Sequence, residues 1–180
     1  MARRDSAPRR FADAAFEIAL RDDSVATWRK QLDGAAETAA SEELQRVLAN
    51  PAIPLEERIA VARKVFASLK EPVLNLVLLL LKRGRIEQLP RVAAEFRRLD
   101  DKRNNLVHAT VTSAAALKPA EVKAIAARLE ELTGSSVDLE TSVDPDLLGG
   151  VVVRVGDRLI DGSVRGRLER LRNQLASGAL

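Results

Sequence analysis

The periodicity of apolar residues changes once along this chain, at residues 104–105, and this change limits the possible folds more than any other feature. Before it, apolar residues recur every three to four positions, as in amphipathic helices. Within 107–111, apolar and polar residues alternate instead, as in a half-buried strand. We therefore expect two domains, 1–105 and 106–180.

Six amphipathic helices are predicted before the change. Ser24 has the character of an N-cap, Asn50-Pro51 ends the third helix, and Gly84 ends the fifth after two basic residues. Helices joined by such short connections form an all-α bundle. The predicted segments are about 8–20, 25–39, 42–49, 55–69, 71–83 and 87–103.

After the change, strand and helix patterns follow in the order β-α-β-β-β-α. Strands are predicted at 107–111, 137–143, 151–155 and 158–160, with a helix over 119–133 that Gly134 ends. Ser163 begins a final helix, whose apolar residues we expect to lie inside. These residues are Val164, Leu168, Leu171 and Leu175. The predicted fold class is α+β with two domains: an N-terminal six-helix bundle followed by a small C-terminal α/β domain.

Composition and motifs point away from an enzyme. The 180 residues contain no Cys and one His, which excludes disulfides, thiol chemistry and a His-rich metal site. His108 occupies the polar phase of a strand and is expected to be an ordinary surface residue, and the phosphate-binding P-loop motif is absent. We predict no catalytic, cofactor-binding or metal-binding residues and no cofactor.

A membrane-spanning helix is not expected either. The longest apolar run covers nine residues, 73–81, and Asn75 interrupts it, whereas a bilayer requires about 20 residues. The chain is expected to be soluble, so that any contact with a membrane passes through a partner.

The first and fifth helices carry more apolar surface than a bundle helix needs. In the first helix, apolar residues between Phe11 and Leu20 cover an arc of roughly 240°, and the fifth is apolar on nearly all sides. One interpretation places the fifth helix at the centre of the core with the first packed against two neighbours. The other places a groove between the two helices that accepts an amphipathic helix from a partner.

A second unusual stretch, 156–171, brings basic residues to a hairpin and to the start of the last helix. Arg158, Arg165, Arg167, Arg170 and, just beyond, Arg172 are its cations. They form either a solvated helix face, with Glu169 as a partial partner, or a basic surface for an acidic helix or a phosphate.

Three segments resemble one known family. They are RRFADAAFEIAL at 9–20, LLLKRGRIEQLPRVAAEF at 79–96 and, most specifically, LLGGVVVRVGDRLIDGSVRGRLERL at 147–171. Together they resemble the delta subunit of bacterial F-type ATP synthases, whose mitochondrial counterpart is the oligomycin-sensitivity-conferring protein.

The resemblance implies a non-catalytic peripheral-stalk subunit of the F-type proton-transporting ATP synthase, which holds the catalytic head to the stalk so that rotation is coupled to ATP synthesis. It implies that the bundle binds the N-terminal helix of an α subunit and that the C-terminal domain binds the end of the b-subunit stalk. One copy per complex is expected, at the cytoplasmic face of the bacterial plasma membrane and without nucleic acid. By resemblance, the head groove comprises Phe11, Ala14, Ala15, Ile18, Leu76 and Leu79, with Trp28 nearby. The stalk-side signature comprises Gly150, Arg154, Gly156, Asp161, Gly162, Ser163 and Arg165, which shape a turn and a cap.

Three other functions stay open on the residues alone. A helical adaptor for another amphipathic-helix partner is the main alternative, because a groove does not name its ligand. A nucleic-acid adaptor would suit the pI of about 9.6, but only 3% of the residues are aromatic. A small-molecule enzyme would need a site that the motifs do not provide.

Overall fold

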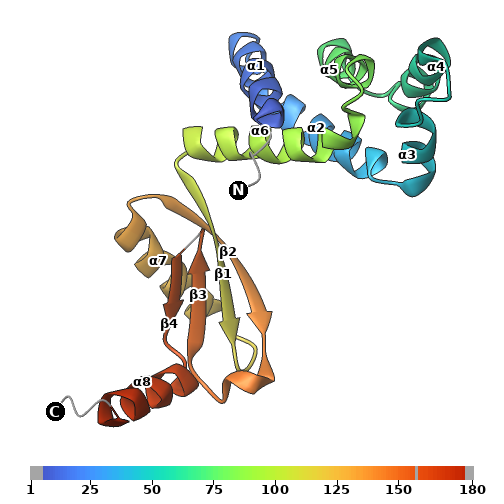
Figure 1. Cartoon of the computed structure of the whole chain (residues 1–180). Coiled ribbons are helices and arrows are strands. Elements are labelled where there is room, and N and C mark those ends of the chain that lie inside the picture. The colour runs from blue at the N-terminus through green and yellow to red at the C-terminus, as the bar shows by residue number, and fades with distance from the viewer. Residues whose placement is uncertain (1–5, 157, 177–180) are drawn as a thin grey trace. The chain divides into compact units, whose positions relative to one another are not determined.

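The computed structural model describes residues 6–156 and 158–176 (Figure 1). The chain divides into two compact units, Met1–Asp100 and Asp101–Leu180. The division falls near the C-terminal end of helix α6 (Leu89–Arg103), a few residues before the change of periodicity. The helical part followed by a small α/β part confirms the predicted fold class.

All six predicted helices of the N-terminal part are present. One is shorter than predicted, because Phe66 leaves the helical conformation (φ −98°, ψ 24°) and the helix ends at Val65. A 3₁₀ turn, Ile86–Gln88, precedes α6 and leaves Pro90 in its first turn, where proline is tolerated. The other helices are α1 (Ala7–Arg21), α2 (Val25–Ala39), α3 (Glu42–Leu48), α4 (Leu55–Val65) and α5 (Glu71–Lys82).

Helix α5 occupies the core of this unit. Val73, Val77, Leu80 and Leu81 are almost completely inaccessible to solvent, together with Leu76 and Leu78. This burial accounts for most of the apolar surface of α5, as expected of a central helix, and leaves Leu79 exposed.

An aromatic cluster joins three helices of the same core. Phe96 of α6 stacks on Trp28 of α2, with ring centroids 6.1 Å apart, and meets Phe16 of α1 edge to face at 5.3 Å. Ala12, Ala15 and Ala19 form the buried side of α1. Small side chains on this face allow α1 to lie close to its neighbours.

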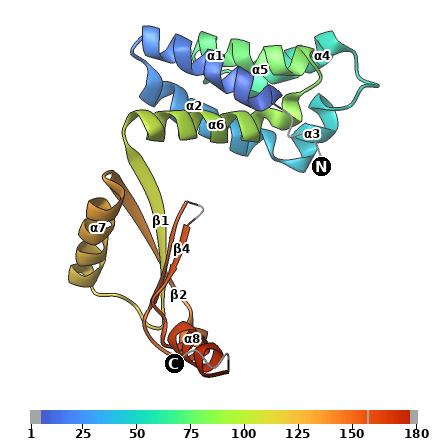
Figure 2. The same ribbon diagram turned by 60° about the vertical axis from the view of Figure 1, so that its left-hand side comes forward.

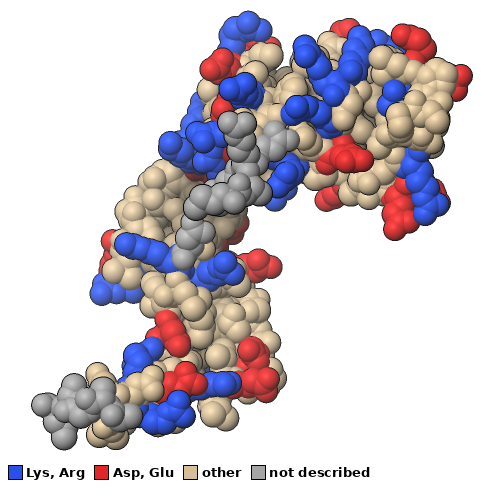
Figure 3. Space-filling view, viewed as in Figure 1, with Lys and Arg blue, Asp and Glu red and all other residues tan. Residues whose placement is uncertain are grey.

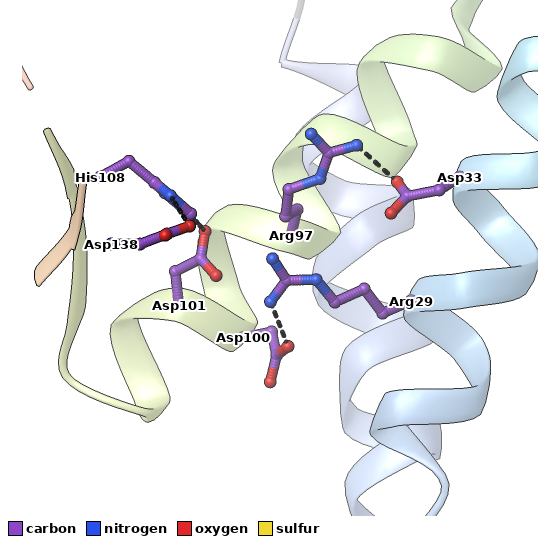
Figure 4. Close-up of polar contacts among 7 residues, drawn as sticks. All are labelled: Arg29, Asp33, Arg97, Asp100, Asp101, His108 and Asp138. Atoms are coloured by element: carbon purple, nitrogen blue, oxygen red, sulfur yellow. Dashed lines mark hydrogen bonds and ion pairs between the residues drawn. The ribbon is translucent and has the colours of Figure 1, made fainter. Parts of the chain in front are cut away.

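Two ion pairs join α6 to α2 (Figure 4). Arg29 Nη1 donates to Asp100 Oδ2 at 2.7 Å, and Arg97 Nη2 donates to Asp33 Oδ1 at 2.7 Å. Asp100 is buried, so the Arg29 guanidinium offsets the cost of removing a carboxylate from water.

The C-terminal unit contains a four-stranded sheet in the order β2-β1-β3-β4. Strand β1 (Leu106–Ser113) pairs in parallel with β2 (Ser136–Val143), and β3 (Val151–Val155) pairs antiparallel with β1 and with β4 (Arg158–Asp161). The crossover helix α7 (Pro119–Thr133) covers one face of this sheet (Figure 2). The core under α7 contains Ala109, Val111, Leu129 and Val153.

The prediction that the last helix has its apolar residues inside is wrong. Helix α8 (Val164–Ala176) projects from the end of the sheet rather than lying on it (Figures 1 and 2). Its side chains Val164, Leu168, Leu171 and Leu175 are 45%, 58%, 52% and 63% exposed. Helix α7 covers the apolar face of the sheet. The other face is mixed: His108, Thr110 and Thr112 of β1 lie there, with Val152 and Leu159 on the neighbouring strands.

Candidate functional site

The predicted head-binding residues of α1 and α5 divide into surface and core positions. Both helices lie on the same side of α6 (Figures 1 and 2). Ile18 and Leu79 are 38% and 41% exposed, and Ala14 is also exposed. These three side chains are available to a partner, while Phe11 is half-buried.

The remaining three predicted head-binding residues are buried. Ala15, Trp28 and Leu76 belong to the hydrophobic core, and Trp28 stacks on Phe96. They therefore pack in the core of the bundle and are not accessible to a partner in this structure.

Two cavities lie on another side of the bundle. A cavity of about 650 Å³ is bordered by α2 and by the turn after α4, where Phe66 and Leu69 lie. A second, of about 320 Å³, is bordered by α3. Both share Thr38 and Val65, so they adjoin one another, and neither involves a residue that we predicted to bind a partner.

The apolar face of α8, which the sequence analysis places in the core, is exposed. Its four apolar residues follow one another at helical spacing, and Leu159 of β4 is also exposed. Basic side chains lie next to uncharged surface over this helix (Figure 3). Arg165 pairs with Glu169 at 3.3 Å, as predicted for a partial partner. The sequence contains the signal, a regular apolar spacing, but spacing alone does not distinguish a core face from a docking face.

Several of the signature residues form the turn that sets the direction of α8. Asp161 Oδ1 accepts a hydrogen bond from the backbone N–H of Ser163 at 2.8 Å, and Ser163 Oγ accepts one from the N–H of Gly166 at 3.0 Å. Ser163 is therefore the N-cap that the sequence predicted. The hydroxyl and the N–H of Ser163 lower the pKa of Asp161, and Arg170 lowers it further.

Gly150 allows this turn to meet the start of β3. Its φ is +81°, and a Cβ on it would lie 2.6 Å from the carbonyl oxygen of Gly162. Two backbone bonds close the junction: Gly162 N–H to Val151 O and Val164 N–H to Gly149 O, each 3.0 Å. Gly150, Asp161, Gly162 and Ser163 thus form the turn and the cap that the signature predicts.

Arg154 and Gly156 lie elsewhere on the sheet. Arg154 is exposed on β3, where it pairs with Leu159 and Thr110, and Gly156 (φ +55°) forms the turn after β3. They do not contribute to the α8 turn, and any contact of theirs with a partner stays a prediction.

The arrangement defines a class of protein before any comparison is made. Each compact unit presents exposed apolar side chains on a helix, which is typical of proteins that bind other proteins. Within residues 6–156 and 158–176, no helix is long and apolar enough to cross a bilayer.

Comparison with known proteins identifies the family. The family model of the ATP synthase delta (OSCP) subunit matches residues 7–175. The chain is 41% identical to the ATP synthase subunit delta of an Anaeromyxobacter species (strain Fw109-5), over 94% of this chain and 97% of that protein. It is 35% identical to the ATP synthase subunit delta of Chromohalobacter salexigens, over 98% of this chain and the whole of that protein. The fold is similar to a chain in the cryo-EM structure of the Toxoplasma gondii mitochondrial ATP synthase hexamer, with a TM-score of 0.65, 20% identity and coverage of 94% and 97%.

The chain therefore belongs to the ATP synthase delta (OSCP) subunit family, as the three sequence segments indicated. It is a non-catalytic stator subunit of the membrane-bound ATP synthase, and its association with the membrane is indirect, through that complex. The family does not support the alternative of a helical adaptor for an unrelated partner.

Proposed function

We propose that the chain clamps the catalytic head of an F-type ATP synthase to its peripheral stalk through two separate surfaces. One observation carries the proposal: each compact unit leaves apolar helix residues exposed, Ile18 and Leu79 in the first and the α8 stripe in the second. A protein that joins two partners needs one attachment surface for each.

The first attachment is to the N-terminal helix of an α subunit of the head. Ala14, Ile18 and Leu79 would contact its apolar side, with Phe11 at the edge. The buried Leu76 and the Trp28–Phe96 stack anchor the helices in the core, so that little ordering is needed on binding.

The second attachment is to the C-terminal end of the b subunit. The α8 stripe would accept the apolar face of a stalk helix, and the arginines beside the stripe favour a helix that carries acidic residues. The turn of Asp161, Gly162 and Ser163 supports this surface by fixing where α8 begins.

The mechanism is mechanical. Rotation in the synthase exerts torque on the head, and ATP synthesis requires the head to stay still relative to the membrane motor. Slow dissociation at both attachments meets this requirement, because affinity differences arise chiefly in the off-rate. One copy per complex, at the cytoplasmic face of a bacterial plasma membrane, completes the proposal.

The test measures, by calorimetry, how the full chain binds each of two peptides. One is the N-terminal helix of the α subunit, and the other is the C-terminal segment of the b subunit. We expect one-to-one binding of each. Leu79→Asp should weaken only the α peptide, and Leu171→Asp only the b peptide, because each places a charge on a different surface. A loss of roughly 2 kcal/mol, about thirtyfold in Kd, follows from losing an apolar contact and burying a carboxylate.

The two variants serve as controls for one another. Both side chains are exposed, so the substitutions should leave the fold intact, which circular dichroism verifies. If each variant kept its affinity for both peptides, or if either variant lost both peptides while folded, the two-surface clamp would be refuted.

A further inference from the structure

His108 makes two contacts that its expected role as an ordinary surface residue did not include. Its Nε2 lies 2.9 Å from Asp101 Oδ2, and its Nδ1 lies 3.1 Å from Asp138 Oδ2 (Figure 4). The imidazole is half exposed and stands between the last turn of α6 and strand β2. All three residues belong to the unit Asp101–Leu180.

The chemistry of the ring makes this arrangement dependent on protonation. A neutral imidazole carries one N–H and can donate to only one carboxylate, whereas its other nitrogen presents a lone pair. An imidazolium donates from both nitrogens and also attracts both negative charges. Only the charged ring therefore satisfies both Asp101 and Asp138.

Asp101 is the more buried of the two carboxylates that contact His108. It is buried, and it lies in the last turn of α6, where the helix dipole disfavours negative charge. Protonated His108 compensates this carboxylate and at the same time joins it to β2 through Asp138.

We propose that His108 is a protonation-dependent clasp that fastens the last turn of α6 to strand β2. When the ring is charged, the segment from Asp101 to His108 is held at both ends. When the ring is neutral, one of the two contacts is lost and the segment opens more often. The stator subunit would thus carry, at the start of its C-terminal unit, a segment whose local opening responds to pH.

Other charged groups surround the clasp and could affect it. On the same face of the sheet, Glu140 and Arg154 both pair with Thr110, which lies two residues after His108 on β1. Lys102 and Arg103 share the last turn of α6 with Asp101. Within residues 6–156 and 158–176, none of these four residues hydrogen-bonds to His108 or forms an ion pair with it. They contribute to the electrostatic field around the ring but are not part of the clasp.

A second set of bonds holds the same segment at any pH and so provides an internal reference. Asn105 accepts a bond from the N–H of Ser136 at 3.0 Å, and its side-chain amide donates to Gly134 O at 3.0 Å. The segment should therefore stay folded when the clasp opens, and only its rate of local opening should change.

The test is amide hydrogen exchange of the full chain at about pH 5.5 and about pH 8.5, on either side of the range in which histidine ordinarily titrates. Exchange is expressed as protection factors, which removes the intrinsic effect of pH. We expect amides of residues 102–108 to be about threefold better protected at the lower pH, the scale of a partly exposed charge pair. Nitrogen chemical shifts of the single histidine should show both ring nitrogens protonated at the lower pH.

Two variants separate the clasp from its surroundings. His108→Gln keeps a polar side chain without the charge and should show equal protection at both pH values. Glu140→Gln removes a nearby charge that does not contact His108 and should keep the wild-type response. The proposal is overturned if His108→Gln retains the response, if Glu140→Gln abolishes it, if the wild-type protein shows no response, or if the ring stays neutral at the lower pH.

Discussion

Replacing Gly150 with alanine should detach α8 from the sheet and destabilise the C-terminal unit. At φ +81°, an alanine is strained whatever space surrounds it. Its Cβ would also lie 2.6 Å from Gly162 O and 2.9 Å from Ser163 Cα, and both of these are backbone atoms that cannot rotate away. The β4–α8 junction would have to shift.

The cost can be worked out from these contacts. Positive φ costs an alanine about 1–2 kcal/mol. Moving the junction breaks the bonds from Gly162 N–H to Val151 O and from Val164 N–H to Gly149 O, at about 1 kcal/mol each. The total is about 3–4 kcal/mol. Gly134→Ala is the matched control, because Gly134 has a similar φ of +67° in the same unit with nothing within 4 Å of its Cβ. It should cost only the strain, about 1–2 kcal/mol.

The chain allows the two units to be followed separately in urea. Its one Trp is Trp28, and its four Phe residues all precede residue 100, with no Tyr anywhere. Trp28 fluorescence therefore reports the N-terminal unit alone, whereas far-UV circular dichroism reports both. With an m-value of about 1–1.5 kcal/mol/M, Gly134→Ala should lower the midpoint of the C-terminal unit by about 1 M and Gly150→Ala by at least 2 M. The fluorescence midpoint should not move.

The difference between the two variants is the decisive quantity. Equal midpoints for Gly150→Ala and Gly134→Ala would show that the junction yields without cost. The argument that Gly150 is required for close approach of the backbones, rather than for its φ alone, would then be refuted. A fluorescence midpoint that moved would show instead that the units do not unfold independently.

Three further predictions concern single side chains. Gly34 lies in α2, and a Cβ added there would have nothing within 4 Å. Gly34→Ala should therefore stabilise the N-terminal unit by about 0.5–1 kcal/mol in a urea titration monitored by Trp28 fluorescence. A lower midpoint would contradict this. Arg29→Met removes the cation beside the buried Asp100 and should cost about 2 kcal/mol by the same assay; an unchanged midpoint would mean that the ion pair adds nothing. The pKa of Asp161 is lowered on folding, so its carboxylate stabilises the C-terminal unit above about pH 4 and this contribution disappears as the pH falls through the lowered value. Asp161→Asn should reduce the acid sensitivity of the dichroism midpoint between about pH 6 and about pH 3, and full retention of that sensitivity would assign it to other groups.

Local signals predicted most of the helix and strand boundaries because they act over a few residues. Asn50-Pro51, Gly84 and Gly134 end elements by their own backbone preferences, and Ser163 caps a helix through a bond three residues away. The predicted end of α4 is wrong because the apolar spacing continues to Leu69 after the backbone has left the helix at Phe66. Leu69 packs against the core although it lies outside the helix, so the apolar spacing indicates burial there rather than helical structure.

Contacts between distant residues could not be predicted in the same way. The pairing of His108 with Asp138 spans 30 residues and depends on the parallel register of β1 and β2. An alternating pattern assigns His108 to the polar face but does not indicate what lies opposite. Trp28 was placed near the head groove for a related reason, since its stacking partner Phe96 comes from a helix far along the chain.

Helix α8 shows what amphipathicity can and cannot establish. The spacing of Val164, Leu168, Leu171 and Leu175 correctly predicts that one face of the helix is apolar, yet it does not specify whether the covering surface belongs to the same chain. Within this unit, α7 already covers the apolar face of the sheet, and the rigid turn at Gly150 and Gly162 directs α8 away from it. A stripe that the fold itself holds apart from its own core is more simply explained by a partner than by a packing defect. We therefore expect the stalk contact on α8, with Gly150 and Gly162 positioning that helix.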